Sequence, residues 1–239
     1  MINLIAKTFL GLLLSLFSLT LLAEPAASTI KSSYDVIGYG MTLAKITETY
    51  TRTQDSYQIE SVTKAVGLLA KLKPETVRVT SHGRITAQGL VPLAYTLTRE
   101  VDKQKNASAK FNWEKGVLTH NDYKGLQDLP LLKGTQDRLS ILYHFPILVN
   151  MAHPELKFGI SDGNNLEPYS FTLAAETQTQ QVPLGSFKTR YLYSTPVAEE
   201  IKYEIWMATE RDNFPCKIIA TDSKGGKLTQ VLTSLSTTP

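Results

Sequence analysis

An alternation of apolar and polar residues with a period of two runs through most of the chain from Tyr34 onward. It is clearest in residues 43–52 and 57–63, where β-branched and aromatic residues stand between polar ones. A period of two is typical of strands that bury one face, because successive side chains point to opposite sides of a sheet. The pattern predicts a mainly β protein of about a dozen antiparallel strands.

The strands are interrupted at two places where helical patterns occur. Residues 67–72 are good helix formers followed by Pro74, which predicts one or two helical turns. A longer helix is predicted to begin near Thr135, which would cap it, with Asp137 in the first turn and Pro146 kinking or ending it. The apolar face of this helix needs a partner, and the sheet is the only large one available.

No linker rich in Pro, Gly or Ser divides the rest of the chain, and no internal repeat occurs. We therefore expect a single β-rich domain over residues 34–239, preceded by a linker at residues 24–33. The fold class predicted is a single highly curled antiparallel sheet, a roll or partly open barrel, with one main helix packed on it.

The first 23 residues have the features of a cleavable signal peptide. Lys7 is their only charge, an apolar run follows at residues 9–22, and the small residue Ala23 ends the segment. The run is shorter than the roughly 20 apolar residues that span a bilayer, although a retained N-terminal anchor is the alternative. We expect export to the periplasm and no integral membrane span in the mature chain.

The cysteine content and the net charge limit how the fold can be stabilised and which partners the protein can bind. Cys216 is the only cysteine, so core packing and not an intrachain disulfide must hold the fold. The formal charge of +3 falls to +2 when Lys7 is removed with the signal. Such a balance gives no electrostatic argument for nucleic acid as a partner.

The polar cluster Gln136, Asp137 and Arg138 is the first candidate for ligand or partner contact. At a helix start it could receive an anion, and Arg138 offers planar bidentate contact. A network that only ties the helix to the sheet is the competing interpretation. Trp113 and Trp206 are the other candidates, since strand aromatics pack in a core or, less often, line a pocket.

Catalytic chemistry is weakly indicated. Asp137, Ser140 and His144 stand at helical spacings that would place them near one face, but the same residues suit a helix start. The four histidines, at positions 82, 120, 144 and 153, lack the close ligand pairs of metal sites. We therefore expect no catalytic residue, no metal and no cofactor, and a buried, unreactive Cys216.

Six short motifs in order resemble the bacterial exported family known as domain of unknown function 3108. They are Tyr34-Asp35-Val36, Gly89-Leu90-Val91-Pro92, Phe111-Asn112-Trp113, Gly134-Thr135-Gln136-Asp137-Arg138-Leu139-Ser140, Leu184-Gly185-Ser186-Phe187-Lys188-Thr189 and Glu204-Ile205-Trp206-Met207-Ala208. The resemblance implies a secreted or periplasmic β-rich protein of Gram-negative bacteria. It carries no assigned activity and no catalytic residue.

Three classes of function are therefore compatible with the sequence. The leading hypothesis is a non-enzymatic binding or carrier module for an apolar or envelope-derived ligand, or for a periplasmic partner protein. A hydrolase of envelope glycans or lipids is the second. The third is a structural or assembly partner that uses an exposed strand edge.

Overall fold

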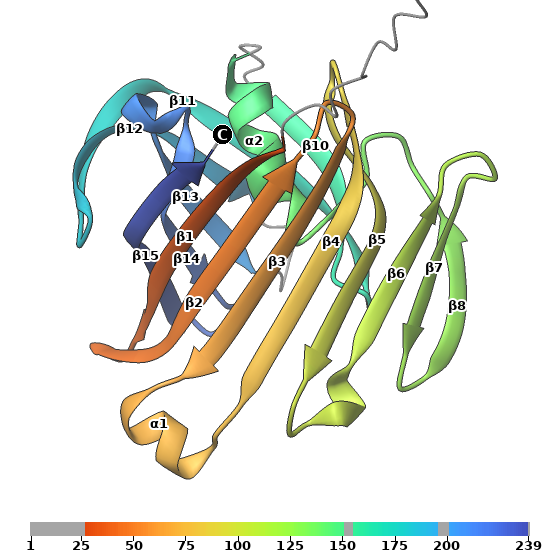
Figure 1. Cartoon of the computed structure of the whole chain (residues 1–239), viewed down its shortest axis with the longest axis horizontal. Coiled ribbons are helices and arrows are strands. Elements are labelled where there is room, and N and C mark those ends of the chain that lie inside the picture. Colours follow the sequence, from red (N-terminus) through yellow and green to blue (C-terminus); the bar gives the residue numbers. More distant parts are fainter. Residues whose placement is uncertain (1–26, 151–154, 196–200, 239) are drawn as a thin grey trace, which may run out of the picture.

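The computed structural model describes residues 27–150, 155–195 and 201–238. These residues form one 15-stranded sheet with the strand order β8-β7-β6-β5-β4-β3-β2-β1-β15-β14-β13-β12-β11-β10-β9 (Figure 1). The strands are β1 (Ser28–Gly38), β2 (Met41–Arg52), β3 (Ser56–Ala65), β4 (Thr76–Thr86), β5 (Gly89–Arg99), β6 (Ala107–Asn112), β7 (Val117–Asp122), β8 (Gly125–Pro130), β9 (Gln136–Asp137), β10 (Glu155–Ser161), β11 (Leu166–Val182), β12 (Gly185–Thr195), β13 (Lys202–Ala208), β14 (Phe214–Thr221) and β15 (Lys227–Thr238).

The alternation in the sequence corresponds to burial on the concave face of this sheet. In β2 the side chains of Ile46, Glu48 and Tyr50 are buried, while those between them are exposed or half-buried. Tyr57 and Ile59 repeat the pattern in the neighbouring strand β3. One face of each strand thus supplies the core, as the period of two predicts.

The sheet curls on itself without closing into a barrel. Strand β1 pairs with β2 on one side and with β15 on the other, so the two ends of the described chain meet in the middle of the sheet. Figure 1 shows β11 and β12 at the upper left and β10 behind the upper ends of β3 and β4, so the two halves of the sheet face each other across the concave side, or hollow, of the roll. The predicted fold class, a curled, partly open antiparallel sheet, is confirmed.

The main helix lies in this hollow. Helix α2 (Ser140–Asn150) packs against β5, and Figure 1 shows it between the front and back strands of the roll. The ring of Tyr143 stacks on Tyr50 of β2 with a centroid distance of 4.6 Å. Pro146 does not end the helix, which continues to Asn150 although the proline removes one helical donor.

Three predicted boundaries differ from the structure. Strand β1 begins at Ser28, so the second half of the predicted linker is strand, because its polar residues pair with both β2 and β15. Gln136 and Asp137 are not the first turn of the helix but strand β9, which pairs in parallel with β10. The helix starts at Ser140 instead.

Other predicted features are found where expected or lie outside the described residues. The short helix α1 (Gly67–Leu72) confirms the helical turns before Pro74. Within the residues described, no helix is long and apolar enough to cross a membrane. The signal peptide predicted at residues 1–23 lies outside the described residues, so it stays a prediction.

Candidate functional site

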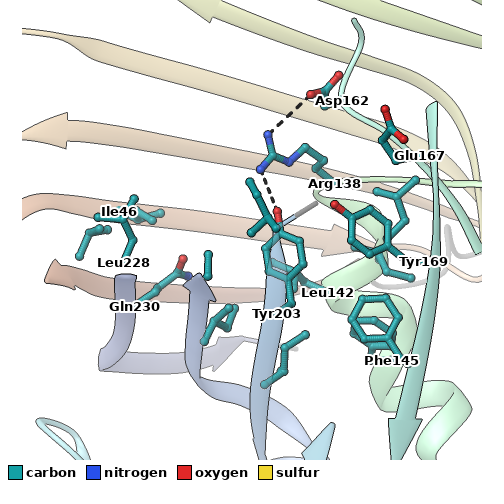
Figure 2. A pocket seen from close by; sticks show the side chains of 18 of the residues that line it. Ile46, Arg138, Leu142, Phe145, Asp162, Glu167, Tyr169, Tyr203, Leu228 and Gln230 are labelled. Atoms are coloured by element: carbon teal, nitrogen blue, oxygen red, sulfur yellow. Dashed lines mark hydrogen bonds and ion pairs between the residues drawn. The ribbon is translucent and has the colours of Figure 1, made fainter. Parts of the chain in front are cut away.

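A cavity of about 720 Å³ lies in the hollow, between helix α2 and both halves of the sheet (Figure 2). Its wall is mostly aliphatic and aromatic, with side chains from α2 and from strands on both sides of the roll. The apolar lining residues are Val36, Ile46, Ile141, Leu142, Phe145, Ile160, Tyr169, Phe171, Ile201, Tyr203, Ile205, Ile218, Ala220 and Leu228. Such a volume and lining are typical of pockets that hold one small apolar molecule.

Arg138 marks the polar side of this cavity. Its Nη2 donates a hydrogen bond to the hydroxyl of Tyr203 at 3.0 Å, and its Nη1 lies 3.8 Å from Oδ2 of Asp162. Figure 2 shows the guanidinium held between these two groups. The Arg138 side chain is 46% exposed, so its charge is accessible from solution.

A second pocket of about 370 Å³ adjoins the first. Arg138, Asp162 and Asn165 line both of them. Unlike the first, the second pocket is lined mainly by charged side chains, namely Arg99, Lys105, Asp122, Lys124, Arg138 and Asp162. The apolar cavity therefore leads into a charged compartment across Arg138.

Gln136 and Asp137, the neighbours of Arg138, do not line either pocket. Both are buried and join β9 to the opposite part of the sheet. The Gln136 amide Nε2 donates to the carbonyl of Leu90 in β5 at 2.9 Å. Oδ2 of Asp137 accepts the Ser81 hydroxyl of β4 at 2.6 Å. Of the predicted cluster, only Arg138 lines a pocket.

The Asp137 carboxylate also begins the helix. Its Oδ1 accepts the backbone amides of Leu139 at 2.9 Å and Ser140 at 2.7 Å, which satisfies two donors of the first turn. Burial raises the pKa of Asp137 to about 6, although these hydrogen bonds and the one from Ser81 act to lower it. The network interpretation of this residue therefore fits its contacts.

Trp113 and Trp206 do not line the two pockets either. Trp113 follows the end of β6, and its indole Nε1 donates to the carbonyl of Pro92 at 2.6 Å. Trp206 is buried beside Tyr191, and its Nε1 donates to Oε1 of Gln178 at 3.0 Å. Both residues pack within the sheet.

The possible catalytic set does not form a reactive arrangement. Ser140 Oγ donates to Oε1 of Gln136 at 2.9 Å, while Nδ1 of His144 accepts the amide of Leu90 at 3.0 Å. Burial lowers the pKa of His144 to about 4, so this ring is neutral near pH 7. All three residues, Asp137, Ser140 and His144, are buried and absent from the lining of both pockets.

The structure describes most of the remaining reactive residue types. Across the described ranges, no three His, Cys, Asp or Glu side chains gather to hold a metal ion. Cys216 is buried, its thiol donates to the carbonyl of Trp206 at 3.4 Å, and burial raises its pKa to about 11. His153 lies outside the described residues.

Sequence reasoning missed a buried serine–histidine pair. Nε2 of His120 in β7 lies 2.8 Å from Oγ of Ser161 at the end of β10. A signal was present, because residues 159–163 read Gly-Ile-Ser-Asp-Gly, the spacing of a nucleophile elbow. An elbow requires a strand, a sharp turn and a helix, whereas here a hairpin joins β10 to β11. Neither side chain reaches the surface, so the pair ties two parts of the sheet together.

A buried carboxyl group, Glu48, was missed as well. It accepts hydrogen bonds from the hydroxyls of Ser61 and Tyr143, both at 3.0 Å, and burial raises its pKa. The sequence does contain a sign of this burial, because Glu48 alternates with the inward-facing Ile46 and Tyr50 along the same strand. The hydrogen bond with Tyr143 fastens α2 to β2.

Comparison with solved structures finds a similar fold in a protein of Brucella abortus, described as a beta-barrel-like protein of domain of unknown function DUF1849. The match has a TM-score of 0.56 and 11% sequence identity, and it covers 88% of this chain and 98% of that one. At this identity the likeness concerns the fold alone. No curated protein matches the sequence.

Comparison with family models agrees with the resemblance seen in the six motifs. The matching model spans residues 31–233, from the first half of β1 to the middle of β15. Nearly all of the curled sheet, helix α2 and both pockets lie within this range. The chain therefore belongs to the family described as Protein of unknown function (DUF3108).

Proposed function

We propose that this protein is a non-enzymatic binding or carrier module that takes up one apolar molecule in the cavity of about 720 Å³. The observation that carries the proposal is the cavity wall, which consists mainly of aliphatic and aromatic side chains. Burial of apolar ligand surface there would supply the binding free energy. Helix α2 contributes Ile141, Leu142 and Phe145 to this wall, so the helix shapes the site and leaves it unfilled.

The contacts of the possible catalytic residues favour binding over hydrolysis. A nucleophile and its base must meet each other and a substrate. Ser140 and His144 instead form hydrogen bonds with Gln136 and with the Leu90 backbone. These hydrogen bonds hold α2 in the roll, so the two residues have a structural role.

A neutral fluorescent probe tests the binding proposal. N-phenylnaphthylamine, whose emission rises in apolar surroundings, is expected to bind the purified mature protein at one site. Ala220→Phe, which projects a larger side chain into the cavity, is expected to weaken binding about tenfold or more by steric exclusion. Thr229→Phe is the matched control.

The control uses the register of neighbouring strands. Thr229 of β15 pairs with Ile219 of β14, whereas Ala220 pairs with Leu228. Because side chains alternate between faces, Thr229 points away from the cavity that Ala220 and Leu228 line. Absence of probe binding by the wild type, or equal loss in both variants, would overturn the proposal.

We also place this activity in the periplasm, on the strength of the signal peptide predicted at residues 1–23. The mature protein is then expected in the periplasmic fraction, with a mass that corresponds to cleavage near Ala23. Inserting two arginines into the apolar run of residues 9–22 is expected to keep the uncleaved chain in the cytoplasm. A wild-type chain that stays full-length and cytoplasmic would contradict this placement.

A partner polypeptide bound along strand β8 is the second candidate function. Strand β8 is an edge of the sheet, and most of its residues are exposed, with Leu126 at 77%. Edge strands of this kind can accept an added strand. A photo-crosslinker at position 126 is expected to capture a partner in cells, while one at the exposed turn residue Tyr39 is not. Equal labelling at both positions would count against this function.

A further inference from the structure

We propose that the ligand is a single-chain amphiphile with an anionic head group, its tail in the cavity of about 720 Å³ and its head group in the adjoining pocket of about 370 Å³. This inference rests on the proposed function and specifies the chemistry of its ligand. The larger cavity is named here the tail cavity and the smaller one the head-group pocket.

The two compartments are contiguous but differ in polarity. Arg138, Asp162 and Asn165 line both, so one molecule can extend from the tail cavity into the head-group pocket. The far wall of the tail cavity contains Phe145, Phe171 and Ile205, which offer no charge. An apolar chain that ends in one polar group matches this division.

The head-group pocket is lined by more cationic than anionic side chains. Its lining holds four cationic side chains, Arg99, Lys105, Lys124 and Arg138, and the two carboxylates of Asp122 and Asp162, while a third carboxylate, Glu167, lines the tail cavity. Cationic surroundings raise the local concentration of anions and oppose the entry of cations.

The carboxylates of this pocket already have partners within their own turns. Oδ1 of Asp162 accepts the backbone amides of Asn164 and Asn165, at 2.9 and 2.8 Å. Oδ1 of Asp122 accepts the amide of Lys124 at 2.7 Å. Their negative charge is thus partly stabilised by the loop backbone.

Two of the cations are engaged outside the pocket. Lys105 pairs with Asp102 at 2.7 Å, and Arg99 lies 3.9 Å from Glu75. Lys124 and Arg138 are therefore the cations best placed to meet the head group.

Arg138 is oriented for this contact. The hydrogen bond from Nη2 to Tyr203 orients the guanidinium, and the 3.8 Å separation of Nη1 from Asp162 is beyond hydrogen-bond range. A guanidinium carries five N–H donors in a fixed plane, which matches a carboxylate or a phosphate through two parallel hydrogen bonds. Arg138 thus has donors for a head group while Tyr203 holds it in place.

The volume of the tail cavity favours one chain. Pockets of about 300–1,000 Å³ hold one drug-sized molecule. The tail cavity falls inside this range, so we assign it one acyl or alkyl tail. Carboxylate and phosphate head groups share the chemistry that Arg138 recognises, and the experiment below separates them.

The test compares four ligands with the same dodecyl-length tail for displacement of N-phenylnaphthylamine. Dodecanoate and dodecyl phosphate are anionic, dodecanol is neutral and dodecyltrimethylammonium is cationic. At least one anion is expected to displace the probe at a concentration about tenfold lower than dodecanol does, and the cation to be the weakest. Which anion is stronger identifies the head group as a carboxylate or a phosphate.

Three variants test whether the preference for anionic ligands comes from the head-group pocket. Arg138→Gln is expected to abolish the advantage of the anions over dodecanol, measured as the ratio of their displacing concentrations within that variant. Lys124→Gln, on the exposed β7–β8 turn, is expected to reduce it about twofold to fivefold. Arg84→Gln, on an exposed residue of β4 outside both pockets, is expected to leave it unchanged.

The outcomes separate the two proposals. Equal displacement by dodecanol and both anions, with the probe still bound, would overturn the head-group assignment while the apolar binding function stands. A preference for anions that survives in both Arg138→Gln and Lys124→Gln would overturn it too. If the probe and all four ligands fail to bind, the proposed function itself falls.

Discussion

His144 Nδ1 accepts the backbone amide of Leu90 across 3.0 Å, and this hydrogen bond joins helix α2 to an unpaired stretch of strand β5. Strand β5 pairs with β6 only from Ala94 to Leu97, so the preceding residues have no neighbouring strand on that side. The side-chain amide of Gln136 donates a hydrogen bond to the carbonyl of the same Leu90 at 2.9 Å. Side chains therefore supply the hydrogen bonds that a closing strand would supply in a complete barrel.

The Leu90 contact predicts different costs for two substitutions of His144. His144→Asn can keep an acceptor near the position of Nδ1, whereas His144→Leu leaves the buried Leu90 amide without one. We expect His144→Leu to lower the free energy of unfolding by about 1–3 kcal/mol more than His144→Asn does. Urea denaturation at pH 7 measures both. Equal losses would show that packing, and not the hydrogen bond, makes His144 important.

Gly89 predicts a large cost for adding one methyl group. Its φ is +114°, outside the conformations open to other residues, and a Cβ there would overlap the ring of His144. We expect Gly89→Ala to lower the free energy of unfolding by about 3 kcal/mol or more. The control is Gly116→Ala, whose φ is +64° with open space around it, and which should cost about 1 kcal/mol. Similar losses in both would mean that the His144 ring moves aside freely.

The sheet could be predicted from the sequence because its strands follow one another along the chain. Each strand from β1 to β8 pairs with the next, as in β2 with β3, so the local alternation and the turns define most of the pairing. The family resemblance extended this expectation to nearly the whole chain. Fold class and the existence of the main helix follow from such local signals.

The boundary errors arise from contacts between distant residues. Gln136 and Asp137 resemble a helix start, but they pair with Ile160 and Ser161 of β10, which no local pattern reveals. Ser28 to Ser33 look like a linker because they are polar, yet two neighbouring strands hold them in the sheet. Tertiary pairing overrides local propensity at both places.

The candidate site could be predicted only in part. The chemistry of its side chain makes Arg138 a candidate from the sequence alone, and it does border both pockets. Trp113 and Trp206 are candidates because aromatic residues of strands can line a pocket, but neither lines one here, and both indoles donate hydrogen bonds within the sheet. The cavity joins β1 and β2 to β13 and β14, and a meeting of such distant strands depends on the curl of the sheet, which the sequence does not specify.

Cys216 predicts a slow thiol reaction in the folded protein. The side chain is buried, and burial raises the pKa of the thiol to about 11, so at pH 8 about one molecule in a thousand carries the reactive thiolate. We expect Ellman's reagent to label the native protein far more slowly than the urea-unfolded chain, which should release one equivalent at once. Labelling at the same rate with and without urea would show that β14 opens readily.

The last prediction concerns pH, because two buried groups of the helix start titrate in opposite directions. The pKa of Asp137 rises from 3.8 to about 6, so its contribution to stability is full below 3.8 and is lost as pH rises through 6. The pKa of His144 falls from 6.5 to about 4, so its contribution is full above 6.5 and is lost as pH falls through 4. Each effect corresponds to about 3 kcal/mol, and between pH 4 and 6 they largely cancel.

Single substitutions should reveal each effect by removing the other. Relative to the wild type, Asp137→Asn is expected to lose stability more steeply as pH falls from 6.5 to 4, because the His144 contribution is then unopposed. His144→Asn is expected to gain stability over the same interval, since only the Asp137 contribution remains. Urea unfolding free energies at half-unit pH steps measure both slopes, and subtracting the wild-type curve removes the common effects of Glu48 and His120. Parallel curves for all three proteins would mean that neither group titrates differently in the folded and unfolded states, and the burial of this pair would then not govern the pH dependence of the fold.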